Sequence, residues 1–338
     1  MPDFLMEDVV KALLQSSEKA AAIARSCCGY SSEALLVAQK GDGEANARFE
    51  KDFKTIADVL AQVCAKHEIK KHCRGLVDNV RGEECAEIGG VTIELKETEE
   101  KTAELLSTLI PVNAAKRMAK AAHCKIKLSL GDIVPLDFPN ISPSDIGVWI
   151  DPIDATAEFI AGVNGEAGAD EGLSCVTVLI GAYLKSTGEP IFGVINQPFH
   201  DKLSSPLGRI VWGLCYGEFR KWGASELQKT LPDSNTFLTS AAETPEVVAQ
   251  IKELGWDVQS VPGAGHKLMK GTTFRWDTCG PHAILKAQGG EILDYTTMLP
   301  LTYNDPDDLE PQAYCNSGGL IAYGADAVFE RLKVIFDK

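Results

Sequence analysis

Apolar residues recur at helical spacing in two segments near the start of the chain. In the first segment they follow Asp3, a candidate helix cap, and comprise Val9, Leu13, Ala20, Ile23 and Cys27. In the second segment they lie at i, i+3, i+4, i+7 and i+8, and comprise Ile56, Val59, Leu60, Val63 and Cys64. Each pattern predicts an amphipathic helix that covers a sheet, and Asp52 and Thr55 stand at the entrance of the second helix.

The middle of the chain changes to short apolar runs separated by turn residues. These runs predict strands of one extended sheet over residues 148–151, 175–183, 191–196 and 210–215. Further along, strands and helices alternate, with strands expected over 236–239 and 257–261 and helices over 246–254 and from Thr278 onward. Two stretches rich in turn-forming and acidic residues, 162–172 and 296–316, are expected to be surface loops.

This order of elements predicts an α/β protein built from two lobes. Residues 1–229 are expected to form an N-terminal α+β lobe, and residues 230–338 a C-terminal α/β lobe. The chain has 338 residues, of which 45% are hydrophobic, and this is ample material for a large core.

Composition and charge argue against several classes of partner. The formal net charge of −15 repels nucleic acid and anionic lipid, and no apolar run is long enough to span a membrane. The ten cysteines include no CxxC pair and no secretory leader precedes them, so we expect a soluble, cytoplasmic protein with reduced thiols. The irregular spacing of Cys64, His67, His72 and Cys73 argues against a zinc site.

Two carboxylates and a hydroxyl stand at the end of an apolar run, in the segment from Trp149 to Thr156. Asp151 and Asp154 supply the hard anionic oxygens that Mg²⁺ prefers, and Thr156 follows with a hydroxyl. The proline between the two aspartates fixes one backbone dihedral, so both side chains and the Ile153 carbonyl can converge on one point. This arrangement is typical of a divalent cation held beside a phosphate.

Other acids also stand beside turns or element ends. Glu83 and Glu84 follow Gly82, a residue that lets the backbone turn sharply. Asp277 precedes the helix expected from Thr278 and is its predicted N-cap, a role that aspartate favours with or without a metal nearby.

Five acids thus lie in four separated segments, namely Asp52, Glu83, Asp151, Asp154 and Asp277. Gathered without a cation they would repel one another and take up protons, whereas two or more Mg²⁺ ions would make them ligands. Bound cations would also give an acidic chain the local positive charge that it needs to bind an anionic substrate. The sequence therefore predicts a metal-dependent phosphoryl hydrolase.

These motifs resemble the magnesium-dependent, lithium-inhibited phosphomonoesterase superfamily of the inositol monophosphatase-like type, in particular its inositol polyphosphate 1-phosphatase branch. The resemblance spans most of the chain and is carried by residues 18–21, 52–58, 82–84, 149–156, 175–183, 193–199, 274–285 and 318–323. It implies a layered αβαβα sandwich and an enzyme that removes the 1-phosphate from inositol 1,4-bisphosphate and inositol 1,3,4-trisphosphate. It further implies inhibition by lithium and two to three Mg²⁺ ions per active site, and we expect a monomer.

The resemblance also assigns metal ligands to this sequence. They are Glu83, Glu84, Asp151, Asp154, Asp277 and the backbone carbonyl of Ile153. One ion would contact Glu83 and the Ile153 carbonyl, and a second would contact Asp154 and Asp277, with Asp151 shared between them.

The catalytic residues that the resemblance implies are Asp52, Thr156 and Glu83. Asp52 would accept a hydrogen bond from Thr156, and this pair, helped by a metal, would position and deprotonate the attacking water. The backbone N–H groups of Ala155 and Thr156 would open a helix and face the phosphate. Ala155 departs from the glycine or serine usual at this position, which bears on specificity rather than on chemistry.

The predicted substrate contacts are Ala155, Thr156, Ser240, Gly263, Ala264, Gly265 and Lys267. Residues 263–267 resemble the substrate loop of the family, in which Lys267 would pair with the second phosphate. The chain is shorter than typical members between Phe199 and Asp277 and in its tail, and such shortening can change which polyphosphate fits.

Two other functions stay open from the sequence. A 3′(2′),5′-bisphosphate nucleotidase has the same metal motifs and differs in needing an aromatic or apolar surface for a purine. A catalytically silent inositol-phosphate-binding or protein-binding module would keep the fold, but it would have no need of the five acids and Thr156.

Overall fold

The computed structural model describes residues 5–28, 35–41, 52–128, 139, 141–168, 171–200, 208–225, 236–239, 245–260, 273–305, 311–325, 327–330 and 333. Its α-helices are α1 (Met6–Ser26), α2 (Ile56–His72), α3 (Glu99–Leu106), α4 (Val112–His123), α5 (Thr156–Asn164), α6 (Pro245–Glu253) and α7 (Arg275–Ala287). Its strands are β1 (Ala38–Gln39), β2 (Phe53–Lys54), β3 (Val80–Gly82), β4 (Glu87–Ile88), β5 (Val91–Thr92), β6 (Ile146–Asp154), β7 (Thr177–Leu184), β8 (Pro190–Gln197), β9 (Arg209–Tyr216), β10 (Phe219–Ala224), β11 (Thr236–Thr239), β12 (Asp257–Ser260), β13 (Glu291–Asp294) and β14 (Leu320–Tyr323).

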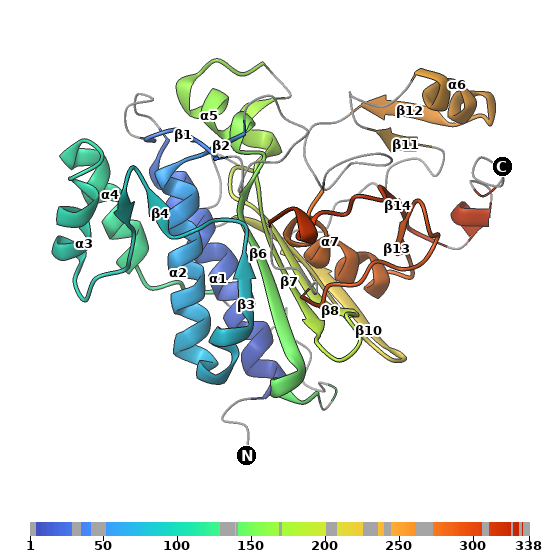
Figure 1. Ribbon diagram of the computed structural model, residues 1–338, viewed down its shortest axis with the longest axis horizontal. Coiled ribbons are helices and arrows are strands. Elements are labelled where there is room, and N and C mark those ends of the chain that lie inside the picture. The colour runs from blue at the N-terminus through green and yellow to red at the C-terminus, as the bar shows by residue number, and fades with distance from the viewer. Residues whose placement is uncertain are drawn as a thin grey trace.

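A six-stranded sheet forms the centre of the molecule, with the strand order β10-β9-β8-β7-β6-β3 (Figure 1). All neighbours are antiparallel except β3 and β6, which run parallel. Strands β6, β7 and β8 are almost continuously buried, as expected for strands covered on both faces. The predicted sheet is therefore confirmed, and its strands are each longer than the sequence indicated or shifted by one or two residues.

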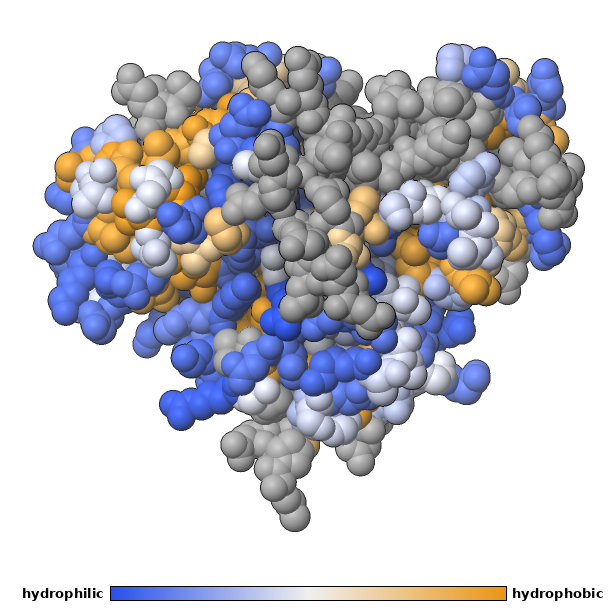
Figure 2. Space-filling model, viewed as in Figure 1, coloured by the Kyte–Doolittle hydropathy of each residue, from blue (hydrophilic) through white to orange (hydrophobic). Residues whose placement is uncertain are grey.

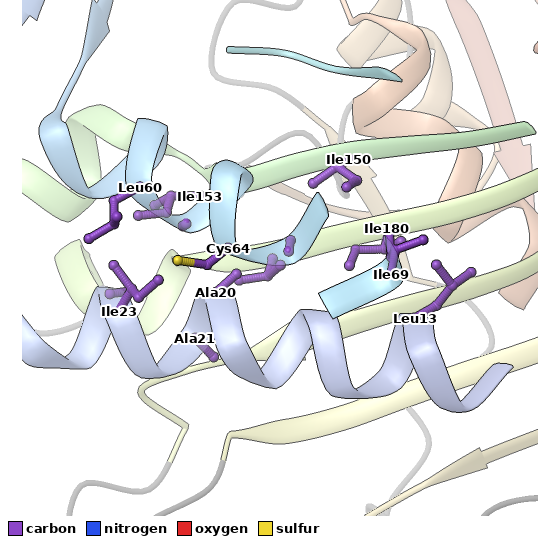
Figure 3. Packing of buried hydrophobic residues seen from close by; sticks show 14 of the residues in the cluster. Leu13, Ala20, Ala21, Ile23, Leu60, Cys64, Ile69, Ile150, Ile153 and Ile180 are labelled. Atoms are coloured by element: carbon purple, nitrogen blue, oxygen red, sulfur yellow. The ribbon is translucent and has the colours of Figure 1, made fainter. Parts of the chain in front are cut away.

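Helices α1 and α2 pack together on one face of this sheet (Figure 3). Their apolar stripes meet through fully buried side chains such as Ile23 of α1 and Leu60 of α2, and the strands contribute Ile150 and Ile180. Both predicted helices are confirmed, since their apolar residues at i, i+3 and i+4 lie on one face of a 3.6-residue helix. The expected cap of α1 at Asp3 lies outside the described residues.

Helix α7 covers the other face of the sheet, and glycines bring it unusually close. A Cβ atom on Gly181 would lie 2.4 Å from the backbone nitrogen of Gly280, and one on Gly193 would lie 1.9 Å from its carbonyl oxygen. The backbone of the helix thus rests on the backbone of β7 and β8. A glycine inside a helix lowers the stability of the helix by about 1 kcal/mol relative to alanine. Gly280 of α7 carries this loss at the position where the helix approaches the sheet most closely.

A second apolar core fills the space beyond α7. It comprises Trp149, Tyr183, Phe274, Trp276, Cys279, Ile292, Leu301, Tyr303 and Leu320. The indole N–H of Trp149 donates to the Tyr303 carbonyl at 2.8 Å and so ties the sheet to the C-terminal segment. Tyr303 is fully buried, so the expectation of a surface loop over 296–316 is wrong at this position.

The layered α/β fold is confirmed. Beyond α7 lie the antiparallel pair β13–β14, the parallel pair β11–β12 and helix α6 (Figure 1). The division into lobes 1–229 and 230–338 stays a prediction, and α7 of the second segment packs directly on the sheet of the first.

Two helix boundaries correct the sequence analysis. Helix α7 begins at Arg275 rather than Thr278, because Asp277 occupies the third helical position and accepts the backbone N–H of Phe274 at 2.8 Å. Helix α5 extends to Asn164 into the stretch expected to be a loop, and it ends at Gly165, which has the left-handed conformation typical of a helix C-terminus.

The surface polarity varies over the face of the molecule drawn in Figure 2. Polar residues cover most of the described lower part of this view, whereas apolar residues gather over α3 and α4. Val112, the first residue of α4, is 53% exposed. Among the described residues no helix is both long and apolar enough to cross a lipid bilayer.

Candidate active site

A bulge in β6 brings Asp151 and Asp154 to the same end of the sheet. Asp151 pairs with Leu179 and Asp154 with Thr177, so one extra residue of β6 is accommodated between them. In a regular strand, side chains at i and i+3 point to opposite faces, and one extra residue reverses that relation. Thr177 then orients the second carboxylate by donating its hydroxyl to Asp154 Oδ2 at 3.2 Å.

Helix α5 begins directly after this bulge. Ala155, its N-cap, has φ 65° and ψ 49°, a left-handed conformation that costs an alanine about 1 kcal/mol and that glycine adopts without this cost. The Ala155 side chain offers no acceptor to the first-turn N–H groups, so these donors are available to an anion. The prediction that Ala155 and Thr156 open a helix is confirmed.

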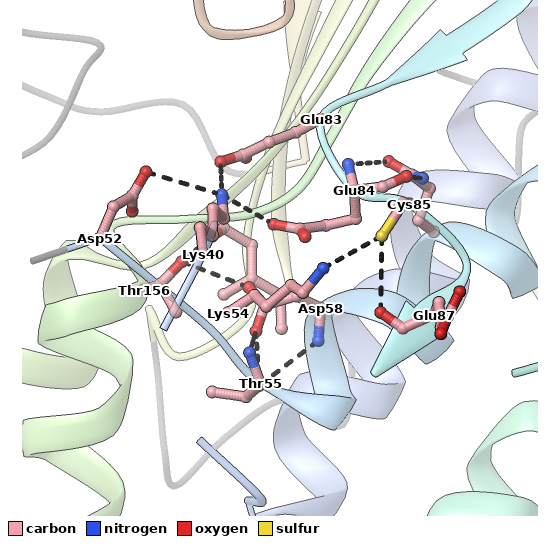
Figure 4. A network of polar contacts seen from close by, with 12 residues as sticks. Lys40, Asp52, Lys54, Thr55, Asp58, Glu83, Glu84, Cys85, Glu87 and Thr156 are labelled. Carbon is pink, nitrogen blue, oxygen red and sulfur yellow. Dashed lines mark hydrogen bonds and ion pairs between the residues drawn. The ribbon is translucent and has the colours of Figure 1, made fainter. Parts of the chain in front are cut away.

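The hydroxyl of Thr156 points to Asp58, not to Asp52. Thr156 Oγ1 lies 3.3 Å from Asp58 Oδ1 and 3.2 Å from the Ile153 carbonyl (Figure 4). The expected pair between Thr156 and Asp52 is therefore wrong. The Asp52 carboxylate instead lies 4.0 Å from the ammonium of Lys40.

Asp58 is fixed by the start of α2. Thr55 caps this helix by accepting the backbone N–H groups of Ala57 and Asp58, and Asp58 Oδ2 in return accepts the backbone N–H of Thr55 at 2.8 Å. This reciprocal capping box leaves Oδ1 for Thr156. Burial raises the pKa of Asp58 to about 6, although the hydrogen bonds from Thr55 oppose the rise.

Lys40 is a second residue that the sequence analysis missed. Its buried ammonium pairs with Glu83 and lies 3.0 Å from Glu84 Oε1 (Figure 4). Burial would lower the pKa of Lys40, but Glu83, Glu84 and Asp52 outweigh it and hold the pKa well above its usual value. Burial also raises the pKa of Glu84 to about 8, with Glu83 adding to the rise and Lys40 opposing it.

Asp151 is the most deeply buried of the acids predicted to bind metal, at 1% exposure. Burial raises its pKa well above the usual value, and the charges of Glu83, Asp154 and Asp277 raise it further. The fold thus brings four predicted ligands into electrostatic contact, one from the turn after β3, two from β6 and one from α7. Asp52, the fifth acid, lies beside Lys40.

The residues at this place fit a divalent cation. Asp151 Oδ1 is buried and has no hydrogen-bond partner among the described residues, and its neighbours are hard carboxylate oxygens. A cation would supply the missing partner and lower the raised pKa values. Within the described part of the chain, no three His, Cys, Asp or Glu side chains converge closely enough to ligate one ion as placed, and Lys40 is the cation that Glu83 and Glu84 contact.

The remaining predicted substrate contacts lie outside the described residues. They are Ser240, Gly263, Ala264, Gly265 and Lys267. Their roles stay predictions.

Removing the Lys40 ammonium is expected to destabilise the fold strongly. Lys40→Met leaves Glu84 buried without its counter-ion, and breaking such a buried pair costs about 3 kcal/mol in the free energy of unfolding. Because the folded pKa of Glu84 is raised above its unfolded value, the ionised form destabilises the fold as pH rises, so the loss should be larger at pH 8 than at pH 6.

Urea unfolding in EDTA at the two pH values measures this loss. Lys11→Met is the matched control, because Lys11 pairs with a partly exposed Glu7 one helical turn away, a contact worth at most about 0.5 kcal/mol. Equal losses in the two variants would show that Lys40 has no special place in the site.

This chain is similar in sequence to several known proteins. A sequence profile described as the inositol monophosphatase family matches residues 5–244. The inositol polyphosphate 1-phosphatases of Mus musculus and Homo sapiens are 35% and 34% identical to it over alignments that cover 94% of this chain and 94% of theirs. The 3′(2′),5′-bisphosphate nucleotidase 1 of Rattus norvegicus is 31% identical over 56% of this chain and 60% of its own.

Among solved structures, the extragenic suppressor protein suhB from Bartonella henselae covers 98% of both chains with a TM-score of 0.55 at 15% identity. An inositol monophosphatase from Zymomonas mobilis covers 97% of this chain and 98% of its own with a TM-score of 0.52, also at 15% identity. At these identities the similarity shows the fold alone.

Proposed function

Since the chain belongs to the inositol monophosphatase family, we propose that it is a Mg²⁺-dependent, lithium-inhibited phosphomonoesterase that removes the 1-phosphate from inositol 1,4-bisphosphate and inositol 1,3,4-trisphosphate. The observation that carries the metal-dependent chemistry is the buried Asp151, whose Oδ1 has no protein partner in the described residues and whose neighbours are three further carboxylates. A site of this kind is neutralised by cations and then accepts an anionic substrate.

Each acid has a place in this proposal. Glu83 and the Ile153 carbonyl would hold one ion, Asp154 and Asp277 would hold a second, and Asp151 would be shared between them. Glu84 is a further neighbour of the first ion. When bound, Mg²⁺ neutralises the phosphate and lowers the pKa of the attacking water.

Thr156 and Asp58 orient that water. The Thr156 hydroxyl donates to Asp58 Oδ1, so the lone pairs of its oxygen face the water as acceptors. As the water attacks phosphorus, its proton would pass to Thr156 while the Thr156 proton passes to Asp58. The bond from phosphorus to the inositol oxygen would break at the same time, and the leaving oxygen would take a proton from solvent water. The raised pKa of Asp58, about 6, suits a group that takes up a proton near neutral pH.

The N-terminus of α5 binds the phosphate in this scheme. Its first-turn N–H groups, from Ala155 onward, have no side-chain cap and present donors and a favourable dipole to an anion. These backbone donors do not depend on the side chain at Ala155.

The choice of inositol over nucleotide rests on how much of the chain each comparison spans. The similarity to inositol polyphosphate 1-phosphatases extends over 94% of the chain, and the similarity to the rat nucleotidase over 56%. The C-terminal segment, which carries Asp277 and the predicted substrate loop, is where most of the predicted substrate contacts lie in the sequence.

Phosphate release from inositol 1,4-bisphosphate tests the proposal. The assay is run with Mg²⁺, with EDTA, with added lithium, and with adenosine 3′,5′-bisphosphate as an alternative substrate. We expect Mg²⁺-dependent, lithium-sensitive release and a preference for the inositol. A strong preference for the nucleotide would move the protein to the nucleotidase branch, and absence of hydrolysis of either substrate would favour a binding module.

A further inference from the structure

Gln62 of α2 holds the turn that carries Glu83 and Glu84. Its side chain is buried, and the amide makes two hydrogen bonds to one residue: Oε1 accepts the backbone N–H of Glu84 at 3.0 Å, and Nε2 donates to the Glu84 carbonyl. A side-chain amide that both accepts from and donates to one residue repeats the pairing of neighbouring strands. It therefore fixes the position and the orientation of the Glu84 backbone.

Gly82, which precedes Glu83, leaves the space that the Gln62 amide fills. A Cβ atom on Gly82 would lie 2.0 Å from Gln62 Oε1 and 2.5 Å from its Cδ, so any side chain there would displace the amide. The other side of the turn is bound to the sheet, because the backbone N–H of Glu83 donates to the Ile150 carbonyl at 3.0 Å. Both glutamates are thus carried by a backbone that is held from two sides.

Gln62 lies one helical turn after Asp58, so the two side chains share a face of α2. Asp58 receives the Thr156 hydroxyl, while Gln62 holds the turn of Glu83 and Glu84. One rigid helix therefore sets the distance between the water-orienting pair and the acidic turn. A shift of Gln62 alone would move the turn and leave Asp58 in place.

Building on the proposed function, we propose that Gln62 is a positioning residue that sets the Mg²⁺ affinity of the site by fixing the backbone from which Glu83 and Glu84 reach the ion. Both polar groups of the Gln62 amide are engaged by Glu84, so Gln62 would act on the ion only through this turn. Removal of a group that orients metal ligands typically weakens metal binding about 10–100-fold. Gln62→Leu keeps most of the volume and removes both hydrogen bonds, so the Mg²⁺ dissociation constant should rise at least about tenfold.

Calorimetric titration of the metal-stripped protein with Mg²⁺, without substrate, measures this constant. Gln15→Leu is the matched control, because Gln15 is a partly buried amide of α1 whose Oε1 has no hydrogen-bond partner among the described residues. Gly82→Ala is the second variant, since its new Cβ would displace the Gln62 amide while Gln62 itself is retained. Unfolding in EDTA is measured in parallel to confirm that each variant is folded at the temperature of titration.

We expect weaker Mg²⁺ binding in Gln62→Leu and Gly82→Ala, and wild-type binding in Gln15→Leu. The Mg²⁺ concentration for half-maximal hydrolysis should rise in the first two, with kcat at saturating Mg²⁺ largely retained. An unchanged dissociation constant in Gln62→Leu, or an equal rise in Gln15→Leu, would overturn the inference. Because binding is measured without substrate, a protein that binds Mg²⁺ but hydrolyses nothing would count against the proposed function alone.

Discussion

Asp154→Asn is expected to lower kcat about a thousandfold while leaving the fold largely intact. Asp154 stands at the end of the β6 bulge, and its negative charge acts on the neighbouring carboxyl of Asp151. The substitution removes one negative charge from the cation site, and the electrostatic contribution of a catalytic metal is worth several kcal/mol. At about 1.4 kcal/mol for each tenfold change, roughly 4 kcal/mol gives the thousandfold loss. Steady-state hydrolysis at several Mg²⁺ concentrations is the measurement.

Glu158→Gln is the control for that experiment. Glu158 lies in the first turn of α5, close to Asp154 in the chain, but its carboxylate accepts the backbone N–H of Gly172 at 2.6 Å and has no proposed part in the chemistry. We expect it to retain kcat within a few-fold. Wild-type turnover in Asp154→Asn would remove the assignment of Asp154 as a metal ligand.

The second large effect is expected at Asp58. Asp58 accepts hydrogen bonds on both oxygens, from the Thr55 backbone N–H and from the Thr156 hydroxyl. Asparagine has only one carbonyl oxygen, so Asp58→Asn must give up one of these bonds. Loss of the proton acceptor for Thr156 is expected to lower kcat about 10²- to 10⁴-fold. If the cap at Thr55 is lost instead, stability falls by about 1 kcal/mol.

Asp52→Asn provides the matched comparison, because it makes the same change in the acid that the sequence had favoured. Asp52 lies 4.0 Å from Lys40, and the Thr156 hydroxyl points elsewhere. We expect its kcat to fall less than tenfold, and thermal unfolding of both variants to separate activity from stability. If the Asp52 variant lost as much activity as the Asp58 variant, the water-orienting role would return to Asp52.

The reason that the sequence favoured Asp52 is physical. Asp52 and Asp58 are six residues apart at the start of one helix, and Asp58 belongs to a Thr-x-x-Asp pattern that a capping box alone explains. Nothing local distinguishes an aspartate that only caps from one that also receives a distant hydroxyl. The contact with Thr156 joins residues 98 positions apart, and only the packing of α2 against β6 creates it.

Local patterns predicted the central sheet and helices α1 and α2 well, because a regular apolar period shows in a short window of sequence. The same windows failed where a single side chain decides a boundary, as Asp277 does at the start of α7. They also failed at Tyr303, a buried residue in a segment whose composition is that of a loop. Lys40 was overlooked because a lysine is usually exposed, and only three distant acids make its burial favourable.

The contact between α7 and the sheet limits how this chain can evolve. Gly181, Gly193 and Gly280 meet backbone to backbone, and Cys279 Sγ is the one side-chain atom among their nearest neighbours. A mutation at any of the three therefore cannot be compensated by repacking nearby apolar residues, as it can elsewhere in a core. Because α7 carries Asp277, the same positions also set how far this acid lies from Asp151. Random libraries selected only for solubility and those selected for hydrolysis should accordingly be depleted of variants at the same three glycines.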